Sequence, residues 1–296
     1  MLKIFNVQTD SGRRFPSLAA LALIAILSGC GPSAEEKARE EKKNIGEALS
    51  SEIENAVQSK DYRRVLLLCD SLDKTCPDQK ELRKKAMTAW TEARHGILVD
   101  SAQLLDSQID SLTNLMTVLM PDFVKVQISS AFDGYRVPKA ISGGTPLVAR
   151  TGIEPRLGDQ DDLWTLVVNV AGSKPSIHGL RLTVPNGGSI EAIADNASER
   201  RATETAGEML SFKAEEVEPI AAALSNCPDL SGAKFEIIGS SRTIPLNLTK
   251  QLADAIVETR QMAKLREERI SLLKKRELIS RKIQLADSQR KGIESK

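Results

Sequence analysis

The fold of this chain is decided by residues 98–119, which read LVDSAQLLDSQIDSLTNLMTVL. Apolar side chains alternate there at intervals of four and three residues, at Leu98, Ala102, Leu105, Ile109, Leu112, Met116 and Leu119. This spacing keeps one apolar seam facing a partner helix as the two helices supercoil. Polar residues, among them Asp100, Asp106 and Asp110, fill the outer positions. The stretch therefore predicts a helix that is paired along its length.

The partner helix is predicted at the other end of the chain, from about Lys250 to Lys291. Its weaker apolar stripe has arginines at two seam positions and consists of Met262, Leu265, Arg269, Leu272, Arg276, Ile279, Ile283 and Ala286. Between Lys264 and Lys291 there are ten Lys or Arg residues and four Asp or Glu residues. The acidic face of the first helix offers a partner for this charge, because opposite charges beside the seam set which helices pair. Binding of the basic helix to a membrane surface is the alternative.

The lengths of the two helices predict a stalk. The first is expected over Asp78–Leu119 and the second over Lys250–Lys291, so that each has 42 residues and spans about 60 Å. One helix enters the middle segment and the other leaves it, so they should run antiparallel. We expect Leu119 near Leu252, and Leu98 near Leu272 or Leu273.

The middle segment changes to the two-residue period of β-strands. Alternation is seen around Val124, Val126 and Ile128, over Trp164–Val170, over Leu180–Val184, at Leu210 and Phe212, and at Phe235 and Ile237, with a short edge at Thr243-Ile244. Pro185-Asn186-Gly187-Gly188 is typical of a hairpin turn, and Val217–Leu224 predicts one short helix. Short strands joined by turns predict an antiparallel sandwich or small barrel.

The predicted fold class is therefore α+β: a helical hairpin and a long antiparallel two-helix coiled-coil stalk, with an inserted antiparallel β-sandwich-like domain. The expected divisions are residues 1–29 as a removed signal, 30–43 as a tether, 44–77 as an αα-hairpin, 78–120 and 249–296 as the stalk helices, and 121–248 as the head.

The N-terminus resembles that of a bacterial lipoprotein. Lys3, Arg13 and Arg14 precede an apolar run from Leu18 to Leu27, which is half as long as a membrane-spanning helix. The run ends in Leu27-Ser28-Gly29-Cys30, which is similar to a lipobox. This resemblance implies cleavage before Cys30, and a diacylglyceryl group on the Cys30 thiol that anchors the protein to a membrane.

Gly31 bears on the destination of the anchor. Aspartate at this position is the usual cue for inner-membrane retention in lipoproteins, and Gly31 stands there instead. We therefore expect the cell envelope, at the outer membrane, on its periplasmic face or at the cell surface.

Two further resemblances concern the folded part. The predicted hairpin over residues 44–77, with Asp61-Tyr62 at its joint and Pro77 at its end, resembles one tetratricopeptide-type unit. A single unit makes no peptide groove, because such repeats need about three copies. The order of parts is similar to a set of bacterial envelope lipoproteins, a resemblance carried by Trp164–Val170, Ile177–Gly188, and Phe235–Ile244 leading into Leu248–Ile256. It implies no activity.

Composition excludes several classes. The chain has 296 residues, 41% of them apolar, with 41 Lys or Arg and 40 Asp or Glu, so there is no basic field for nucleic acid. Two histidines, His95 and His178, and four cysteines are too few for an ordinary His/Cys metal cluster. After cleavage Cys69, Cys76 and Cys227 remain besides Cys30. Cys69 is expected as a small core residue, and we predict no disulfide.

Individual polar groups also have ordinary explanations. Asp159, Asp161 and Asp162 cluster without the glycine and terminal glutamate of a calcium loop, and Ser142-Gly143-Gly144-Thr145 is not followed by the Lys-Ser/Thr of a phosphate loop. His178 is expected on the apolar face of its strand, as a sheet-edge residue. Trp90 and His95 are expected to be packing or surface residues. We predict no catalytic, cofactor or metal site, and one modified residue, Cys30.

The sequence favours a non-enzymatic lipid-anchored envelope protein with a structural or binding role, whose partner would be an envelope protein or a glycan. The first alternative is a glycan- or peptidoglycan-binding head, which would use an exposed aromatic residue such as Tyr135, since Trp164 is expected to be buried. The second is an envelope hydrolase with acidic residues that meet only in the fold. A second apolar stripe at Ile270, Leu273, Leu278 and Leu285 would allow the stalk to form a homo-oligomer.

Overall fold

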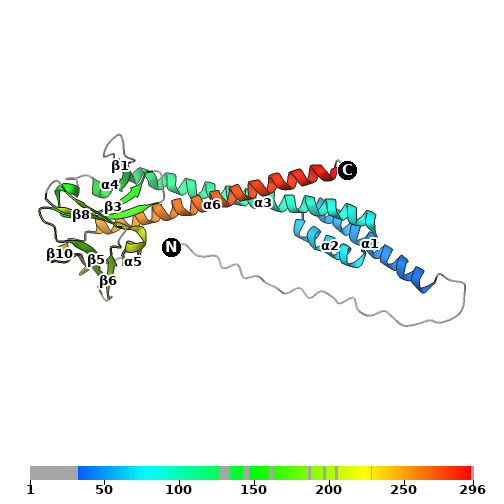
Figure 1. Ribbon diagram of the computed structural model, residues 1–296, viewed down its shortest axis with the longest axis horizontal. Helices are drawn as coiled ribbons and strands as arrows, with labels where there is room; N and C mark the ends of the chain where they lie inside the picture. The colour runs from blue at the N-terminus through cyan, green and yellow to red at the C-terminus, as the bar shows by residue number, and fades with distance from the viewer. Residues whose placement is uncertain are drawn as a thin grey trace.

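The computed structural model describes residues 33–126, 134–142, 147–159, 163–185, 188–195, 198–203, 206–227 and 229–294. They build a helical hairpin, a two-helix stalk and a β-rich head (Figure 1). The hairpin and the head lie at opposite ends of the stalk, and the last helix runs back from the head toward the hairpin. This is the predicted α+β fold class.

The helical elements are, in chain order, α1 (Ala34–Gln58), α2 (Tyr62–Thr75), α3 (Lys80–Leu119), η1 (Met120–Asp122), α4 (Lys139–Ser142), η2 (Leu147–Ala149), α5 (Ala214–Ser225) and α6 (Lys250–Glu294). The strands are β1 (Phe123–Val126), β2 (Tyr135–Pro138), β3 (Gly152–Gly158), β4 (Trp164–Val170), β5 (Ile177–Thr183), β6 (Ser189–Ile193), β7 (Glu199–Ala202), β8 (Glu208–Lys213), β9 (Lys234–Gly239) and β10 (Thr243–Leu246).

The hairpin forms as the residues at its joint predict. Asp61 is the N-cap of α2, and its carboxylate accepts a hydrogen bond from the Arg64 amide at 3.2 Å. α1 begins at Ala34, so residues 34–43 of the expected tether are helical and continue into the hairpin. The physical reason is a capping box between Ser33 and Glu36, which satisfies free amides at the helix start.

The hairpin packs on the first half of α3. Val65, Leu72 and Ala93 are fully buried in its core. The Tyr62 ring lies directly against Gly96, where any side chain would collide with it. Cys69 and Cys76 are buried and Cys227 is half-buried, and all three are free thiols.

The two long helices pair as predicted. Ile109, Leu112 and Leu272 form a buried cluster between α3 and α6. Both seam arginines reach across to α3. Arg269 Nε donates to Thr113 Oγ1 at 3.0 Å, and Arg276 Nε donates to Asp106 Oδ1 at 2.8 Å.

The predicted register of the two helices is wrong. Arg276 lies opposite Asp106 and Asp287 lies opposite His95, which brings Leu98 level with residue 284, not with Leu272 or Leu273. By the same offset Leu119 is level with residue 263, not with Leu252. The reason is that the first turns of α6 are buried in the head, so the two helices do not start and end together.

The head consists of two antiparallel sheets around a main apolar core, with a smaller buried cluster of Leu147, Val167 and Met209. Strand order is β1-β2-β3-β4-β8-β7 in the larger sheet and β10-β9-β5-β6 in the smaller one. Phe212 on β8 and Phe235 on β9 are among its largest fully buried side chains. The start of α6 contributes Ala253, Ile256 and Met262 to the same core.

Most strands with apolar alternation are confirmed: those at 164–170, 180–184, 210–212, 235–237 and 243–244 correspond to β4, β5, β8, β9 and β10, and α5 covers Val217–Leu224. At β1 Phe123 is the buried residue, and Ile128 lies outside the described residues. β2, β3, β6 and β7 were not individually predicted. In β3 the buried residues Ile153, Pro155 and Leu157 alternate with Glu154 and Arg156, but a proline inside the run argues against a strand. β7 is exposed throughout, so it carries no apolar alternation.

Candidate functional site

The lipid site and two of the acidic residues lie outside the described part of the chain, namely Cys30, Asp161 and Asp162. Asp159 is described, and two cations already hold its carboxylate: Lys125 Nζ at 2.5 Å and Arg136 Nε at 2.9 Å. The hydrogen bond from Lys125, with the charges of both cations, lowers the pKa of Asp159. This carboxylate is therefore engaged in a strand-to-loop ion pair. Within the described ranges no group of three or more His, Cys, Asp or Glu residues is placed to hold a metal ion.

The glycine-rich loop is described only at its first residue. The Ser142 hydroxyl donates to the Lys139 carbonyl at 3.1 Å, inside the short helix α4. Gly143, Gly144 and Thr145 lie outside the described residues.

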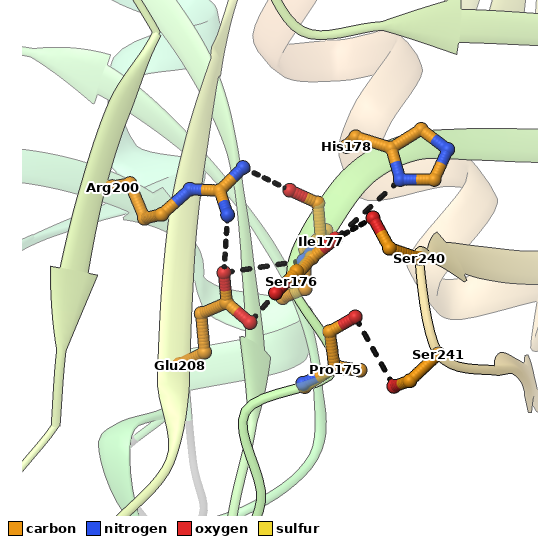
Figure 2. Close-up of polar contacts among 8 residues, drawn as sticks. All are labelled: Pro175, Ser176, Ile177, His178, Arg200, Glu208, Ser240 and Ser241. Atoms are coloured by element: carbon orange, nitrogen blue, oxygen red, sulfur yellow. Dashed lines mark hydrogen bonds and ion pairs between the residues drawn. The ribbon is translucent and has the colours of Figure 1, made fainter.

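A buried carboxylate joins the two sheets of the head (Figure 2). Glu208, at the start of β8, is 5% exposed, and its two oxygens accept from the Ile177 amide at 3.1 and 3.2 Å. Arg200 on β7 pairs with Glu208 at 3.0 Å and also donates to the Ile177 carbonyl. Since Ile177 is the first residue of β5 in the other sheet, these contacts form an inter-sheet bridge. Both oxygens of Glu208 are used in it.

A histidine and two serines lie beside this bridge. The Ser240 hydroxyl donates to the Ser176 carbonyl at 3.5 Å, and His178 Nδ1 lies 3.4 Å from the same carbonyl (Figure 2). The Ser241 hydroxyl donates to the Pro175 carbonyl at 3.3 Å. A nucleophile needs its base within hydrogen-bond reach, and these hydroxyls are directed to backbone carbonyls instead. The cluster therefore closes the sheet ends and has no nucleophile–base pair among the residues drawn.

The predicted position of His178 is wrong in two respects. β5 is an inner strand of its sheet, between β9 and β6. The register shifts between Ile177 and Gly179, directly after Ser176, whose φ of 57° is left-handed. This bulge places Ile177 in the core, fully buried, in place of His178.

The aromatic residues of the head are mostly internal. Trp164 is 4% exposed, as predicted. Tyr135 is half-buried, and the Arg156 guanidinium lies over its ring at 4.1 Å from the centroid. The remaining described head aromatics, Phe123, Phe212 and Phe235, are buried, and Phe132 lies outside the described residues.

A groove between α2 and α3 contains a cavity of about 490 Å³. Its lining includes Cys69, Leu72, Lys80, Lys84, Met87 and Trp90. Met87 is 61% exposed and Trp90 38%, and the Arg94 guanidinium lies 4.6 Å from the Trp90 ring centroid. Burial raises the pKa of Cys69 to about 11, so at neutral pH it is an unreactive thiol. The groove can contact an apolar surface, and its described lining holds no activated nucleophile.

Sequence reasoning missed Glu208 and Arg200, because nothing local distinguishes them from surface charges on short strands. His95, expected as a packing or surface residue, meets α6 at its far end, with Nε2 at 3.1 Å from Asp287 Oδ1. The groove could have been found from the helical spacing of Lys80, Lys84, Met87 and Trp90.

Comparison with protein-family models, with curated proteins and with solved structures finds no match to this chain. None of the helices in the described residues combines the length and the apolar character needed to cross a bilayer. Any function must therefore be argued from the residues and their arrangement.

Proposed function

We propose that this protein is a non-enzymatic, lipid-anchored component of a bacterial cell envelope, in which a helical stalk holds a β-rich head away from the membrane for a structural or binding role. The observation that carries the proposal is that the first helix, which follows Cys30 closely, lies far from the head. α1 begins at Ala34, four residues after Cys30, in the hairpin at one end of the stalk. The head lies at the opposite end (Figure 1).

The dimensions of the stalk support a spacer. α3 has 40 residues and is therefore about 60 Å long. It packs against α6 along the seam and against the hairpin over its first half, so it has packing partners along most of its length. An acyl group on Cys30 would hold the hairpin at the membrane surface and the head tens of ångströms away. Gly31 following the cysteine favours the outer membrane.

Labelling with radioactive palmitate tests the anchor. The full-length chain is expected to take up the label and to remain in the membrane fraction. Cys30→Ala should abolish both, whereas Cys227→Ala, a matched control at a half-buried cysteine of the head, should change neither. A Cys30→Ala chain that stays membrane-bound would contradict the anchoring half of the proposal.

The glycan-binding alternative rests on Tyr135 among the described head aromatics, because it is the one that is only half-buried. Binding of the full-length protein to a glycan array or to peptidoglycan, lost on Tyr135→Ala and kept on Tyr62→Phe in the hairpin, would favour it. We do not propose the hydrolase, since the polar groups near His178 and Glu208 are committed to hydrogen bonds within the head.

A further inference from the structure

A second apolar stripe runs along α3 beside the seam. It consists of residues that immediately precede seam residues: Ile97 before Leu98, Leu104 before Leu105, Ser111 before Leu112, and Val118 before Leu119. Leu104 is 62% exposed and Val118 73%, and nearby Leu115 is 51% exposed. Large apolar side chains repeated on one face at heptad spacing are unusual on a solvated helix surface.

The neighbouring helix carries the same feature. On α6, Leu278 precedes the seam residue Ile279 and Leu285 precedes Ala286. They are 58% and 61% exposed. In an antiparallel pair, residues that precede these seam positions lie on the same side of both helices. Together, Ile97, Leu104, Ser111, Leu115, Val118, Ser271, Leu278 and Leu285 define what we call the stalk face.

The other sides of α3 are already occupied. The seam faces α6. Asp106 and Thr113, which follow seam residues, accept hydrogen bonds from the two α6 arginines. The hairpin packs against Ala86, Ala93 and Gly96. The exposed residues of the stalk face, Leu104, Leu115 and Val118, lie beyond the stretch of α3 that the hairpin covers, whereas Ile97, four residues after Ala93, is half-buried. Leu273, expected in one stripe with Leu278 and Leu285, follows the seam residue Leu272 and so lies on the opposite side.

Three residues of the stalk face on α3 are matched in level by residues of the stalk face on α6, whereas Leu115 and Val118 are level with Glu267 and Lys264. The contacts of Asp106 with Arg276 and of His95 with Asp287 fix the register. In that register Ile97 is level with Leu285, Leu104 with Leu278, and Ser111 with Ser271. In these three pairs large side chains therefore share a level with large ones, and small with small, on two different helices.

We propose that the stalk face binds a second copy of this chain, side by side, with the two-fold axis along the stalk. Such an axis preserves level, so that Leu104 of one copy meets Leu278 of the second copy, and Ile97 meets Leu285. It also sets each α3 beside an α6 of the second copy, and these helices run antiparallel. The result is a four-helix stalk in which every neighbouring pair is antiparallel.

The charges fit this partner. The α3 residues of the stalk face, from Ile97 to Val118, are uncharged. At its edge, Asp100 on α3 and Lys282 on α6 are exposed, and neither forms an ion pair in the described part of the chain. They lie at the same level, so the proposed axis sets Asp100 of each copy beside Lys282 of the other.

The size of the face predicts a modest affinity. Its 22 residues along α3 extend about 33 Å, and two helices are about 20 Å wide, which gives about 600 Å² per copy and about 1,200 Å² in total, at the lower end of specific interfaces. The inference does not depend on the lipid anchor. If both copies are anchored, the axis places both hairpins at the same membrane, and confinement there favours pairing.

Cross-linking between two tagged chains tests the geometry. Both full-length chains carry Cys227→Ser, one carries Leu104→Cys and the other Leu278→Cys, so any new disulfide joins two molecules. Mild oxidation of membranes that contain both chains should give a product with both tags. The matched control pairs Leu104→Cys with Leu285→Cys, which are displaced by about 10 Å along the stalk, and its yield should be several-fold lower. No two-tag product, or equal yields from the two pairs, would overturn the proposed axis.

Mass measurement of the full-length protein in detergent tests the partner. The chain should have twice its monomer mass at high concentration, and Leu104→Glu with Leu278→Glu should return it to the monomer, because carboxylates would face an apolar surface. Leu67→Glu, at a 69% exposed leucine of α2 outside the stalk face, is the matched control and should leave the dimer intact.

A charge exchange separates specific pairing from loss of folding. Asp100→Lys alone should lower the dimer fraction, and Asp100→Lys combined with Lys282→Glu should restore it, with helical content unchanged throughout. A protein that is monomeric at all concentrations, both in detergent and in membranes, would overturn the proposal and leave the stalk face to a different protein. A dimer that persists in the Leu104→Glu, Leu278→Glu variant would place the interface elsewhere and would also overturn the proposal.

Discussion

The two parts of α6 meet very different surroundings. Between residues 253 and 263 one side of the helix is buried in the head: Ala253, Ile256, Met262 and Ala263 are at most 4% exposed and belong to the main core. Beyond Arg266, which still donates to the Gly158 carbonyl of the head, the helix contacts α3 along one seam, where Leu272 at 9% and Ala286 at 8% are the most buried apolar residues. One helix is thus a core element at its start and half of a coiled coil at its end. We therefore expect the head to contribute more to the free energy of unfolding than the seam between α3 and α6.

Truncation of one apolar residue in each part should give the largest difference. Ile256→Ala removes a fully buried side chain from the head core and should lower the free energy of unfolding by about 2–5 kcal/mol. Leu272→Ala, in the small seam cluster, should cost about 1–2 kcal/mol, because fewer neighbours lose contact. Urea unfolding of the full chain measures both.

Leu273→Ala is the control for this pair. It is 40% exposed and next to Leu272, so its effect should stay within about 0.5 kcal/mol. Equal losses from Ile256→Ala and Leu272→Ala would mean that head and stalk contribute equally, and the contrast between the two parts of α6 would be wrong.

Polar contacts should show the same contrast at a smaller scale. Arg200→Ala removes the cation from Glu208, which is 5% exposed, and should destabilise the head by about 1–3 kcal/mol because a buried carboxylate loses a partner. Asp106→Ala removes the cross-helix partner of Arg276. Because the Asp106 side chain is 50% exposed and the Arg276 side chain 30% exposed, the loss should lower the free energy of unfolding by less than about 1 kcal/mol. Thermal unfolding of both variants, followed by circular dichroism, decides between them. A larger loss from Asp106→Ala would reverse the assignment of stability to the head.

The sequence predicts the seam better than the buried polar groups for a physical reason. A seam on one face repeats every 3.5 residues, so Leu105, Ile109 and Leu112 can be recognised from spacing alone. Arg269 and Arg276 were likewise placed at seam positions, and both cross to α3. Glu208 and Ile177 are 31 residues apart, and no local pattern brings a carboxylate of one strand to an amide of another.

The register between α3 and α6 cannot be predicted from local patterns either. It depends on how many turns of α6 the head covers, which is a property of the folded core and not of either helix. Equal helix lengths suggested a common start, but the buried turns around Ile256 shift the pairing toward the C-terminus. The bulge after Ser176 that removes His178 from the core is also set by contacts between strands. The lipid site at Cys30 stays a prediction, because it lies outside the described residues.

The junction between head and stalk should be sensitive to acid. Glu218 on α5 accepts from Arg260 on α6 at 2.6 and 2.8 Å and from Lys264 at 2.7 Å, and these hydrogen bonds, led by Arg260, lower its pKa to about 2. Above about pH 4.5 the carboxylate is ionised in both states and the stabilisation is complete. As the pH falls from 4.5 toward 2, the unfolded state takes up the proton first and the stabilisation is lost.

Glu218→Gln should therefore lower stability at pH 7 by about 1 kcal/mol or less, since the side chain is 37% exposed, and the difference should disappear toward pH 2. Urea midpoints measured at pH 7, 5, 4 and 3 follow this loss. Glu215→Gln, at an exposed residue of the same helix, should have no such pH dependence. A Glu218→Gln effect that is constant across this range would show that the ion pair does not join α5 to α6.

The smallest effect is expected at the far end of α6, where only a short stretch of seam remains. Asp287 meets His95 of α3 there, with side chains 45% and 22% exposed, so Asp287→Asn should change global stability by no more than a few tenths of a kcal/mol. The local effect should be clear, because a helix end held on one side opens without unfolding the rest. Amide hydrogen exchange should become faster at residues 283–294 and stay unchanged around Ile256. Glu277→Gln, which removes a pair made within α6 to Arg281, should leave exchange at the helix end as it is. Equal acceleration by both variants would mean that the last turns of α6 are held by the helix itself and not by α3.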